Sequence, residues 1–535
     1  MGALTSKRFP FELRSWDIEK FESIDPTDGF GSNTRIYVSK SQIVQIEPEY
    51  DIFSFNTWLT DKGRQFFDSV FGTWSQNKTI NLQQNFWFTL TKTIIKTFYF
   101  ADQFKKTNLN HFFTIVFENL SLEVLSFLIT TAQKYSFVSI KRAENLNKNN
   151  NDLESSFQIN LTNNKTKLTN STLCLLISNN PRYESYFLNL SLRQRISKGN
   201  FKCFSIGSII DLTFPVVFLG SNVNVLKTIA TGNSLICQNF KSSTKPLTIY
   251  NNEILKRTDG NKIVEMFNVL KYADVFSKTW NSLNIVSNTL SETGIHSIGK
   301  FSSLRKKDLE SFGVLYFLNV SSNSLTYLKQ IIDFKILNYK KTSYKKSNID
   351  NIILEQSLIP NKIFEFYNQN YSNNNNKYFY LPTNVLYENE ETFINIEGLV
   401  KRTTKVIFRD NSINNWQMLR KTFKQFQENL NFLENKNNLL VLLNSKDLIE
   451  FKNFTYFQYQ ATQSLINLNF YLSLKSQPFI ILNKKFKSHK NKLFLTKLKY
   501  WLDDFYTGGK DEYSKSSFNM TNCSKILRLK TTNFF

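Results

Sequence analysis

Cysteine and histidine, the side chains that most often bind metals or act as nucleophiles, are rare in this sequence and lie far apart. The four cysteines and three histidines stand at Cys174, Cys203, Cys237, Cys523, His111, His296 and His489. No Cys-x2-Cys pair occurs, and no histidine lies at ligand spacing from a cysteine. The sequence therefore predicts free thiols in a reducing compartment, without a metal centre or a disulfide framework.

An acidic cluster is the next candidate for chemistry. Glu388, Glu390 and Glu391 lie close together, and paired carboxylates can act as general acid and base. Because these three acids stand in a polar turn, we interpret them as solvated and predict no catalytic residue. Loops of the GxGxxG or GxxxxGKS/T type are missing from the predicted strand–helix turns, so no nicotinamide, flavin or ATP site is expected.

The turn at residues 179–184 (NNPRYE) follows an apolar run at 173–178 (LCLLIS) that is typical of a strand covered on both faces. A polar turn between such a strand and a helix is where doubly wound folds bind anions. The alternative is a structural turn held by Arg182, paired with Glu184 or with another neighbour. We favour the structural interpretation.

The sequence pattern alternates predicted strands with predicted helices, which indicates an α/β fold. These elements would position the acidic residues and the turn at 179–184. Residues 111–118 form a predicted strand, followed at 120–135 by a helix with Ser121 at its N-cap and Glu123 in its first turn. Further strands are predicted at 202–206, 245–250, 312–320 and 363–367, and helices at 83–98 and 416–423. No run of about 18 uncharged apolar residues occurs, so no membrane span is predicted.

The first 70 residues predict a small β unit. Residues 28–31 (DGFG) mark a tight turn, because glycine takes a positive φ without steric cost. Residues 34–38 and 42–47 largely alternate polar and apolar side chains, as half-buried strands do. Residues 62–64 (KGR) then lead into a helix.

This β unit resembles the first small domain of the molybdopterin oxidoreductase superfamily. That domain normally carries cysteines spaced C-x2-C-x3-C and a fourth about 27 residues on, which bind an iron–sulfur cluster through thiolates. Aligned on the glycine landmarks, the four positions are occupied by Asp25, Asp28, Ser32 and Thr60. None is a thiol, so the resemblance implies that the fold of this domain is retained but that its iron–sulfur cluster is absent. In molybdopterin enzymes the turn that matches residues 179–184 contacts the pterin dinucleotide.

One family in that superfamily combines this frame with lost cysteines: the large, 75 kDa subunit of respiratory complex I, the proton-pumping NADH:ubiquinone reductase. The sequence resembles it at residues 2–7 (GALTSK), in an Asn-Pro-Arg-x-Glu turn made of Asn180, Pro181, Arg182 and Glu184, and at Glu391, Thr392, Phe393, Asn395, Glu397 and Gly398. In that family GALTSK follows the last cluster cysteine of the front half. We therefore expect the chain to be the C-terminal part of a split subunit.

The resemblance implies a fold and a division into domains. The expected fold is α/β of the molybdopterin oxidoreductase type, with a small N-terminal β domain followed by Rossmann-like parallel-sheet domains. The cluster-less β domain is expected at 1–72 and the main α/β region at 73–430, with Asn- and Lys-rich insertions near 141–170 and 338–377. A divergent C-terminal region is expected at 431–535.

The resemblance also implies a function. The chain would be a structural subunit of the NADH-oxidising module, scaffolding electron transfer from NADH to ubiquinone while carrying no cofactor and no metal itself. Iron–sulfur clusters would lie on a separate front-half polypeptide, and FMN on the neighbouring flavoprotein subunit. These two, with the quinone-module subunits, are the expected partners, on the matrix side of the mitochondrial inner membrane.

Two other functions are open to the sequence. An active molybdopterin oxidoreductase would need a metal-coordinating residue and a nearby cluster, and the lost thiols argue against it. A nucleic-acid-binding or ribosome-associated protein would explain the net charge of +24. Basic residues are spread singly along the chain, however, and abundant Lys, Asn, Phe, Ile and Tyr are what an AT-rich genome encodes. We therefore predict no nucleic-acid partner.

Overall fold

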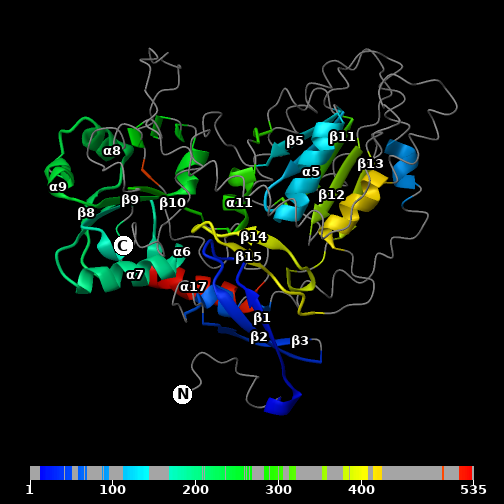
Figure 1. The fold of residues 1–535 in the computed structure, drawn as a ribbon, viewed down its shortest axis with the longest axis horizontal. Helices are drawn as coiled ribbons and strands as arrows, with labels where there is room; N and C mark the ends of the chain where they lie inside the picture. Colours follow the sequence, from blue (N-terminus) through cyan, green and yellow to red (C-terminus); the bar gives the residue numbers. More distant parts are fainter. Residues whose placement is uncertain are drawn as a thin grey trace.

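The computed structural model describes three parts of the chain: an N-terminal β unit and two α/β units, joined by a small hairpin (Figure 1). The described residues are 13–40, 42–50, 58–65, 67–68, 87, 89–94, 112–135, 137–143, 168–207, 209, 211–234, 236–257, 259–260, 262–263, 266–267, 282–287, 289–298, 301–304, 313–320, 352–357, 377–382, 384, 386–407, 414–424, 497–498 and 517–532.

The N-terminal unit is an antiparallel sheet of three strands, β1 (Glu19–Ile24), β2 (Asn33–Ser39) and β3 (Gln42–Pro48), paired in that order. It follows a short 3-10 helix, η1 (Ser15–Asp17), and precedes α2 (Asp61–Gln65). The strands predicted at 34–38 and 42–47 are thereby confirmed. Their inward side chains share a core with Tyr387, Val406 and Ile407, so residues from 386–407 complete the unit that was assigned to 1–72.

The first α/β unit is a parallel sheet in the order β10-β9-β6-β7-β8. Its strands are β6 (Leu173–Ile177), β7 (Lys202–Ile206), β8 (Val217–Gly220), β9 (Pro246–Asn251) and β10 (Leu283–Val286). Its helices are η5 (Leu168–Asn170), α6 (Pro181–Glu184), α7 (Tyr186–Ser197), α8 (Val223–Ala230), α9 (Ile236–Ser242) and η6 (Asn252–Lys256). Two clusters of buried apolar side chains contact this sheet, which is why β6 is apolar throughout.

The second α/β unit is a parallel sheet in the order β13-β12-β11-β4-β5. Its strands are β4 (Phe113–Phe117), β5 (Val138–Arg142), β11 (Val314–Leu318), β12 (Ile352–Ser357) and β13 (Lys377–Pro382). The helix α5 (Leu122–Lys134) and the helical residues 415–424 pack on it, as does part of the helical segment 89–94. The βα unit predicted at 111–135 is thus confirmed, although the Ser121 side chain makes no cap hydrogen bond.

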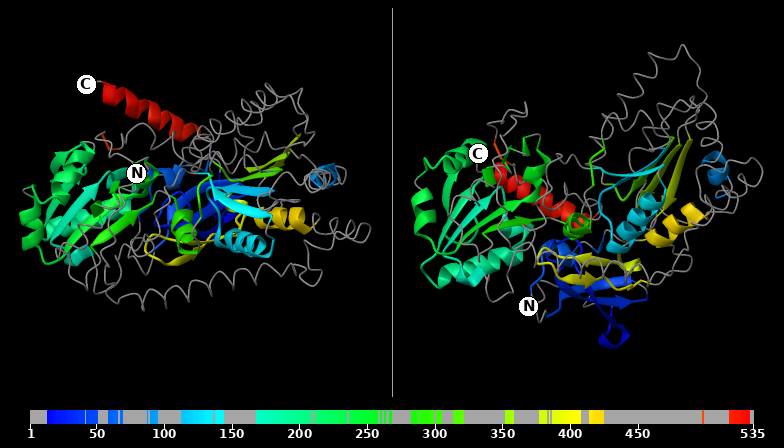
Figure 2. Two further views of the ribbon diagram at one scale, coloured as in Figure 1. Left: turned by 90° about the horizontal axis from the view of Figure 1, so that it is seen from above. Right: turned by 45° about the horizontal axis from the view of Figure 1, so that its top comes forward.

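A hairpin joins the three parts. The strands β14 (Thr392–Ile394) and β15 (Val400–Arg402) pair antiparallel after the short η8 (Leu386–Glu388), with Asn395, Glu397 and Gly398 in the predicted turn between them. Figures 1 and 2 both show this hairpin between the N-terminal unit and the two parallel sheets. Helix α11 (Ser291–Ile298) links the sheets to it, and α17 (Phe518–Thr532) contacts α2.

One sequence prediction was wrong in this region. Residues 338–377 were expected to be an insertion, yet β12 (Ile352–Ser357) is a central strand with Ile352 and Leu354 fully buried. Its apolar run is only two or three residues long between polar neighbours, which hid it. The predicted strand at 363–367, most of the insertion near 141–170 and most of region 431–535 lie outside the described residues.

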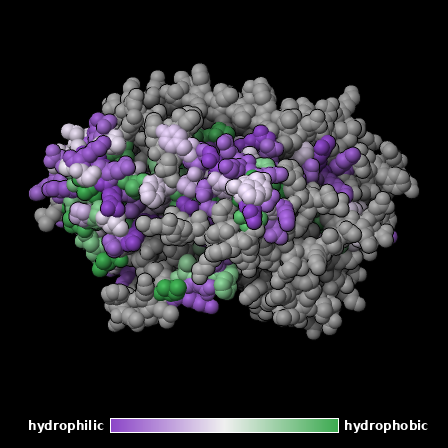
Figure 3. Space-filling model, turned by 90° about the horizontal axis from the view of Figure 1, so that it is seen from below, coloured by the Kyte–Doolittle hydropathy of each residue, from purple (hydrophilic) through white to green (hydrophobic). Residues whose placement is uncertain are grey.

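The described surface is mostly hydrophilic, with small hydrophobic areas on the face shown in Figure 3. Two pairs of the large exposed apolar side chains share an element, Val217 and Phe218 on β8 and Phe518 and Ile526 on α17. The others in the described part come from separate elements or loops: Trp16, Tyr50, Trp58, Ile209 and Val400. Scattered apolar residues of this kind are ordinary on folded proteins. None of the described helices is both long and apolar enough to cross a membrane.

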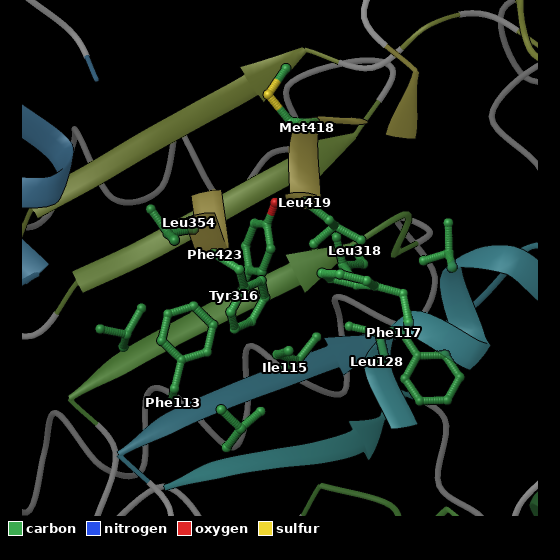
Figure 4. Packing of buried hydrophobic residues seen from close by; sticks show 14 of the residues in the cluster. Phe113, Ile115, Phe117, Leu128, Tyr316, Leu318, Leu354, Met418, Leu419 and Phe423 are labelled. Carbon is green, nitrogen blue, oxygen red and sulfur yellow. The ribbon is translucent and has the colours of Figure 1, made fainter. Parts of the chain in front are cut away.

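Tyr316 lies in the second unit's core, where its ring meets that of Phe113 edge to face, and Phe113 in turn packs on Phe423 (Figure 4). The Tyr316 hydroxyl donates a hydrogen bond to Oε1 of buried Gln356. Tyr316→Phe should therefore cost about 2 kcal/mol of unfolding free energy, because it leaves that oxygen buried without a donor. Urea unfolding of the purified chain measures the loss. Tyr37→Phe is the control, since its hydroxyl bonds Glu47 at a half-buried position where water can replace it.

Candidate functional site

The turn between β1 and β2 is held by its own carboxylates. Oδ1 of Asp25 accepts hydrogen bonds from the Thr27 amide (2.9 Å) and hydroxyl (2.7 Å). Asp28 accepts from the Phe30 amide (3.3 Å) and from the Ser32 hydroxyl (3.1 Å). The Asp25 amide donates to the Ser32 carbonyl at 2.8 Å, which closes the turn. The two aspartates are buried, and so is Ser32.

The fourth position of this set, Thr60, lies against the same turn. Its Oγ1 accepts the Gly63 amide at 2.8 Å, at the start of α2. A Cβ built on Gly63 would lie 2.0 Å from Oδ2 of Asp25 and 3.1 Å from Oγ1 of Thr60. The fold thus brings Asp25, Asp28, Ser32 and Thr60 together from two segments, and α2 approaches Asp25 so closely that only glycine fits at 63.

Asp28 has an unusual protonation equilibrium. Burial, and then the charge of Asp25, raise the pKa of Asp28 to about 7, against an ordinary value of 3.8. Lys401 partly offsets this effect; its Nζ donates to the Gly31 carbonyl (2.8 Å) and to Oδ1 of Asn33 (3.0 Å). The turn therefore holds a carboxyl that binds a proton near neutral pH.

These residues do not fit an iron–sulfur cluster. Such clusters are bound by thiolates, whereas all four positions here carry oxygen, and at least three of them are engaged in hydrogen bonds within the turn. Cys174 and Cys203 lie elsewhere, opposite each other on β6 and β7, and burial raises the pKa of Cys174. Among the described residues, no three His, Cys, Asp or Glu side chains are grouped to hold a metal.

Tyr186 is a further residue of this site, and nothing in the sequence indicated it. Its hydroxyl lies 2.9 Å from the Ser32 hydroxyl and also donates to the Trp58 carbonyl. Next to it, the rings of Phe30 and Phe187 meet edge to face, with centroids 5.5 Å apart. The turn is thus attached to α7, and through α7 to the first parallel sheet.

The turn at residues 178–184 lies where the strand order reverses, between β6 and β9. Glu184, not Arg182, holds it: Oε2 of Glu184 accepts the Asn180 amide (3.1 Å) and the Asn251 side chain (2.8 Å). Arg182 extends to exposed Asp211, with its Nη1 3.1 Å from Oδ2. The side-chain amides of Asn179 and Asn180 are buried without hydrogen-bond partners.

This turn does not fit the pyrophosphate of a pterin dinucleotide. An anion at such a turn binds to backbone N–H groups at the start of the helix. Here the Asn180 backbone amide already binds the Glu184 carboxylate, whose charge would repel a phosphate group. The structural interpretation of the turn is therefore the one that its geometry supports.

Glu184→Ala should loosen this turn and cost about 2 kcal/mol of unfolding free energy, because it leaves the Asn180 amide and the Asn251 side chain without their acceptor. Chemical unfolding of the purified chain measures the loss. Arg182→Ala is the matched control and should change stability little, since its partner Asp211 is exposed. A larger effect at Arg182 than at Glu184 would contradict this assignment.

The acidic cluster is solvated only in part: the Glu390 side chain is exposed, whereas Glu388 is buried and Glu391 half-buried. Glu390 pairs with Arg402 at the surface. Burial and the charge of Glu123 raise the pKa of Glu391 to about 7. The sequence could not show this, because Glu123 lies far away in the chain and meets Glu391 only through the packing of α5 against β14.

Comparison with known proteins gives a family. The model of the molybdopterin oxidoreductase family matches residues 103–425, which is more than half of the chain. The N-terminal unit, with Asp25, Asp28, Ser32 and Thr60, precedes the matched segment.

Three curated relatives are similar over large parts of the chain. The NADH-ubiquinone oxidoreductase 75 kDa subunit of Reclinomonas americana is 28% identical, over 78% of this chain and 59% of the relative. The same-named protein of Acanthamoeba castellanii is 24% identical, over 100% of this chain and 70% of the relative. An NADH-quinone oxidoreductase subunit of Rickettsia bellii is 27% identical, over 62% of this chain and 48% of the relative.

The chain therefore spans between about half and 70% of the length of these relatives. The order of its elements agrees with the family match, since two parallel sheets with helices between their strands lie mostly within residues 103–425. The fold class expected from the sequence is thereby confirmed, and the chain belongs to the molybdopterin oxidoreductase family.

Proposed function

We propose that the chain is a subunit of NADH–ubiquinone oxidoreductase, respiratory complex I, and that it acts there as a scaffold without a redox centre of its own. The names of the three relatives support the first part. One observation carries the second part: the residues at the four positions of the expected cluster, Asp25, Asp28, Ser32 and Thr60, lie close together, and each of the four has a side-chain oxygen engaged in a hydrogen bond.

A scaffolding role is physically reasonable for this site. The turn contacts α7 through Tyr186 and the hairpin through Lys401. The Asn395 side chain donates to the Phe30 carbonyl at 3.1 Å, and the Ile396 amide donates to the Gly29 carbonyl at 3.1 Å. Where related domains use a metal cluster, this chain uses hydrogen bonds to hold its parts together.

The proposed partners are other subunits of complex I. They comprise the cluster-bearing part of the same subunit, whether continuous with this chain or separate from it, the FMN-bearing flavoprotein and the quinone-module subunits. The proposed location is the matrix side of the mitochondrial inner membrane. Sequence similarity to 75 kDa subunits supports these proposals.

A native gel of mitochondrial membranes solubilised in mild detergent tests the proposal. The high-mass band that oxidises NADH should contain this chain, identified by mass spectrometry, and the mass of its polypeptide tells whether the cluster-bearing part is continuous or separate. The isolated chain, without the cluster-bearing part, should contain neither iron nor molybdenum. Migration with ribosomes would overturn the complex I assignment, and stoichiometric iron or molybdenum bound to residues 13–532 would overturn the scaffold role.

A further inference from the structure

Two acidic side chains meet where α5 packs against the hairpin and the helix at 415–424. Glu123, in the first turn of α5, is buried. Its Oε2 accepts the backbone amide of Thr392 at 3.1 Å, so the carboxyl group lies against the chain at the start of β14. Glu391, the residue before Thr392, is only half-buried. The pair therefore joins the second α/β unit to the hairpin and has an opening to solvent.

Two oxygens at this junction have no donor. Oε1 of Glu123 is buried without a hydrogen-bond partner. Asn415 donates from Nδ2 to Oε1 of Glu391 at 3.3 Å, while its own Oδ1 is buried without a partner. Three elements of the fold thus bring the Glu123 carboxylate to the amide that follows Glu391, and the Asn415 side chain to Glu391 itself. Two of the side-chain oxygens at this junction stay unpaired, which is costly in a protein interior.

The charge at this junction is also uncompensated. No ion pair to Glu123 or Glu391 exists within the described part of the chain; the nearby Arg402 pairs with Glu390 instead. Burial raises the pKa of both carboxyl groups. A buried carboxylate next to a half-buried one is stabilised by a proton or by a cation near the pair.

A set of ligands made only of oxygen favours a hard divalent cation over a transition metal. We propose that Glu123, Glu391 and Asn415 bind a divalent cation of the Ca²⁺ or Mg²⁺ class, which ties α5 to the hairpin and to the helix at 415–424. The cation neutralises the carboxylate pair and gives both orphaned oxygens a partner. Solvent reaches it past half-buried Glu391. The site does not depend on the proposed function, because it lies outside the turn at 25–32.

Equilibrium dialysis of the purified full chain, stripped with EDTA and then exposed to calcium chloride or magnesium chloride, tests the site. The wild-type chain should bind one cation more per molecule than Glu391→Gln does, and its Tm should rise when the cation is added. The affinity of Glu391→Gln should fall at least about tenfold. Glu390→Gln is the matched control, because that neighbour pairs with Arg402 and should bind as the wild type does.

Two further results decide between a cation and a shared proton. Glu391→Gln removes a negative charge that lies next to buried Glu123, so it should fold at least as stably as the cation-free wild type. Asn415→Ala keeps both carboxylates and removes one ligand oxygen, and it should also weaken binding about tenfold or more. Binding that is equal in wild type and Glu391→Gln, or no rise in wild-type Tm with either cation, would overturn the proposal and leave a shared proton as the compensating charge.

Discussion

Gly29→Ala should destabilise the folded chain by about 3 kcal/mol or more, a large loss for the addition of a single methyl group. A Cβ at position 29 would lie 2.2 Å from the Ser287 carbonyl oxygen and 2.5 Å from Cδ1 of Ile396. The Ile396 side chain is fully buried, and its amide donates to the Gly29 carbonyl, so neither segment can withdraw without losing contacts. The substitution therefore separates the β unit, the hairpin and the first parallel sheet at the point where they meet.

Urea unfolding of the purified chain measures this effect, and Gly199→Ala is the control. Gly199 has a positive φ of 77°, but no atom lies within 4 Å of the position that an added methyl group would occupy. Its substitution should cost only the backbone strain of a left-handed residue, about 1 kcal/mol. Equal losses at 29 and 199 would mean that backbone conformation, and not the close approach of three segments, determines the need for glycine at 29.

The parts of the fold that the sequence predicted are those where local pattern and burial agree. The run LCLLIS at 173–178 has apolar side chains on both faces, and β6 is buried on both faces. The alternation at 34–38 and 42–47 corresponds to strands with one face in a core. In both cases the periodicity of the side chains is set by the same burial that stabilises the strand.

The parts that the sequence missed depend on contacts between distant segments. Tyr186 joins the turn at Ser32 across 154 positions of the chain, and Glu123 meets Thr392 across 269. Arg182 was expected to pair with Glu184 or with another neighbour; the structure pairs it with Asp211, 29 positions on, and Glu184 accepts the Asn180 amide. A charged side chain in a turn has several possible partners within its reach, and only the packed structure selects one of them.

The four positions of the expected cluster combine a feature that the sequence could predict with one that it could not. Glycine landmarks predicted that Asp25, Asp28, Ser32 and Thr60 correspond to the cysteines of related domains, and this correspondence stays a prediction. The structure shows that the four residues lie close together, with Gly63 packed between Asp25 and Thr60. The raised pKa of Asp28 could not be predicted from the sequence. It arises from burial under the hairpin and α7, and from the distance between two carboxyl groups, neither of which a single sequence contains.

Asp28→Asn should remove a pH dependence from the stability of the chain. The pKa of Asp28 is about 7 in the folded state, against 3.8 for an ordinary aspartate. Below about pH 4 both states hold the proton, and between about pH 4 and 7 only the folded state does, so stability falls as pH rises through that window. A difference of about three pKa units corresponds to about 4 kcal/mol at most. The asparagine variant carries no such penalty.

The stability gain of the variant over the wild type should therefore be larger at about pH 8 than at about pH 5, by up to about 3 kcal/mol, because about two of the pKa units between 3.8 and 7 lie above pH 5. Urea midpoints of both chains, measured from about pH 5 to about pH 8.5, give the difference curve, in which the contribution of Glu391 cancels. Asp17→Asn, at an exposed position, changes the same formal charge and should leave the curve parallel to wild type. If the Asp28→Asn curve is parallel as well, Asp28 is ionised in the folded chain across this range, and the turn at 25–32 binds no proton at this carboxyl group.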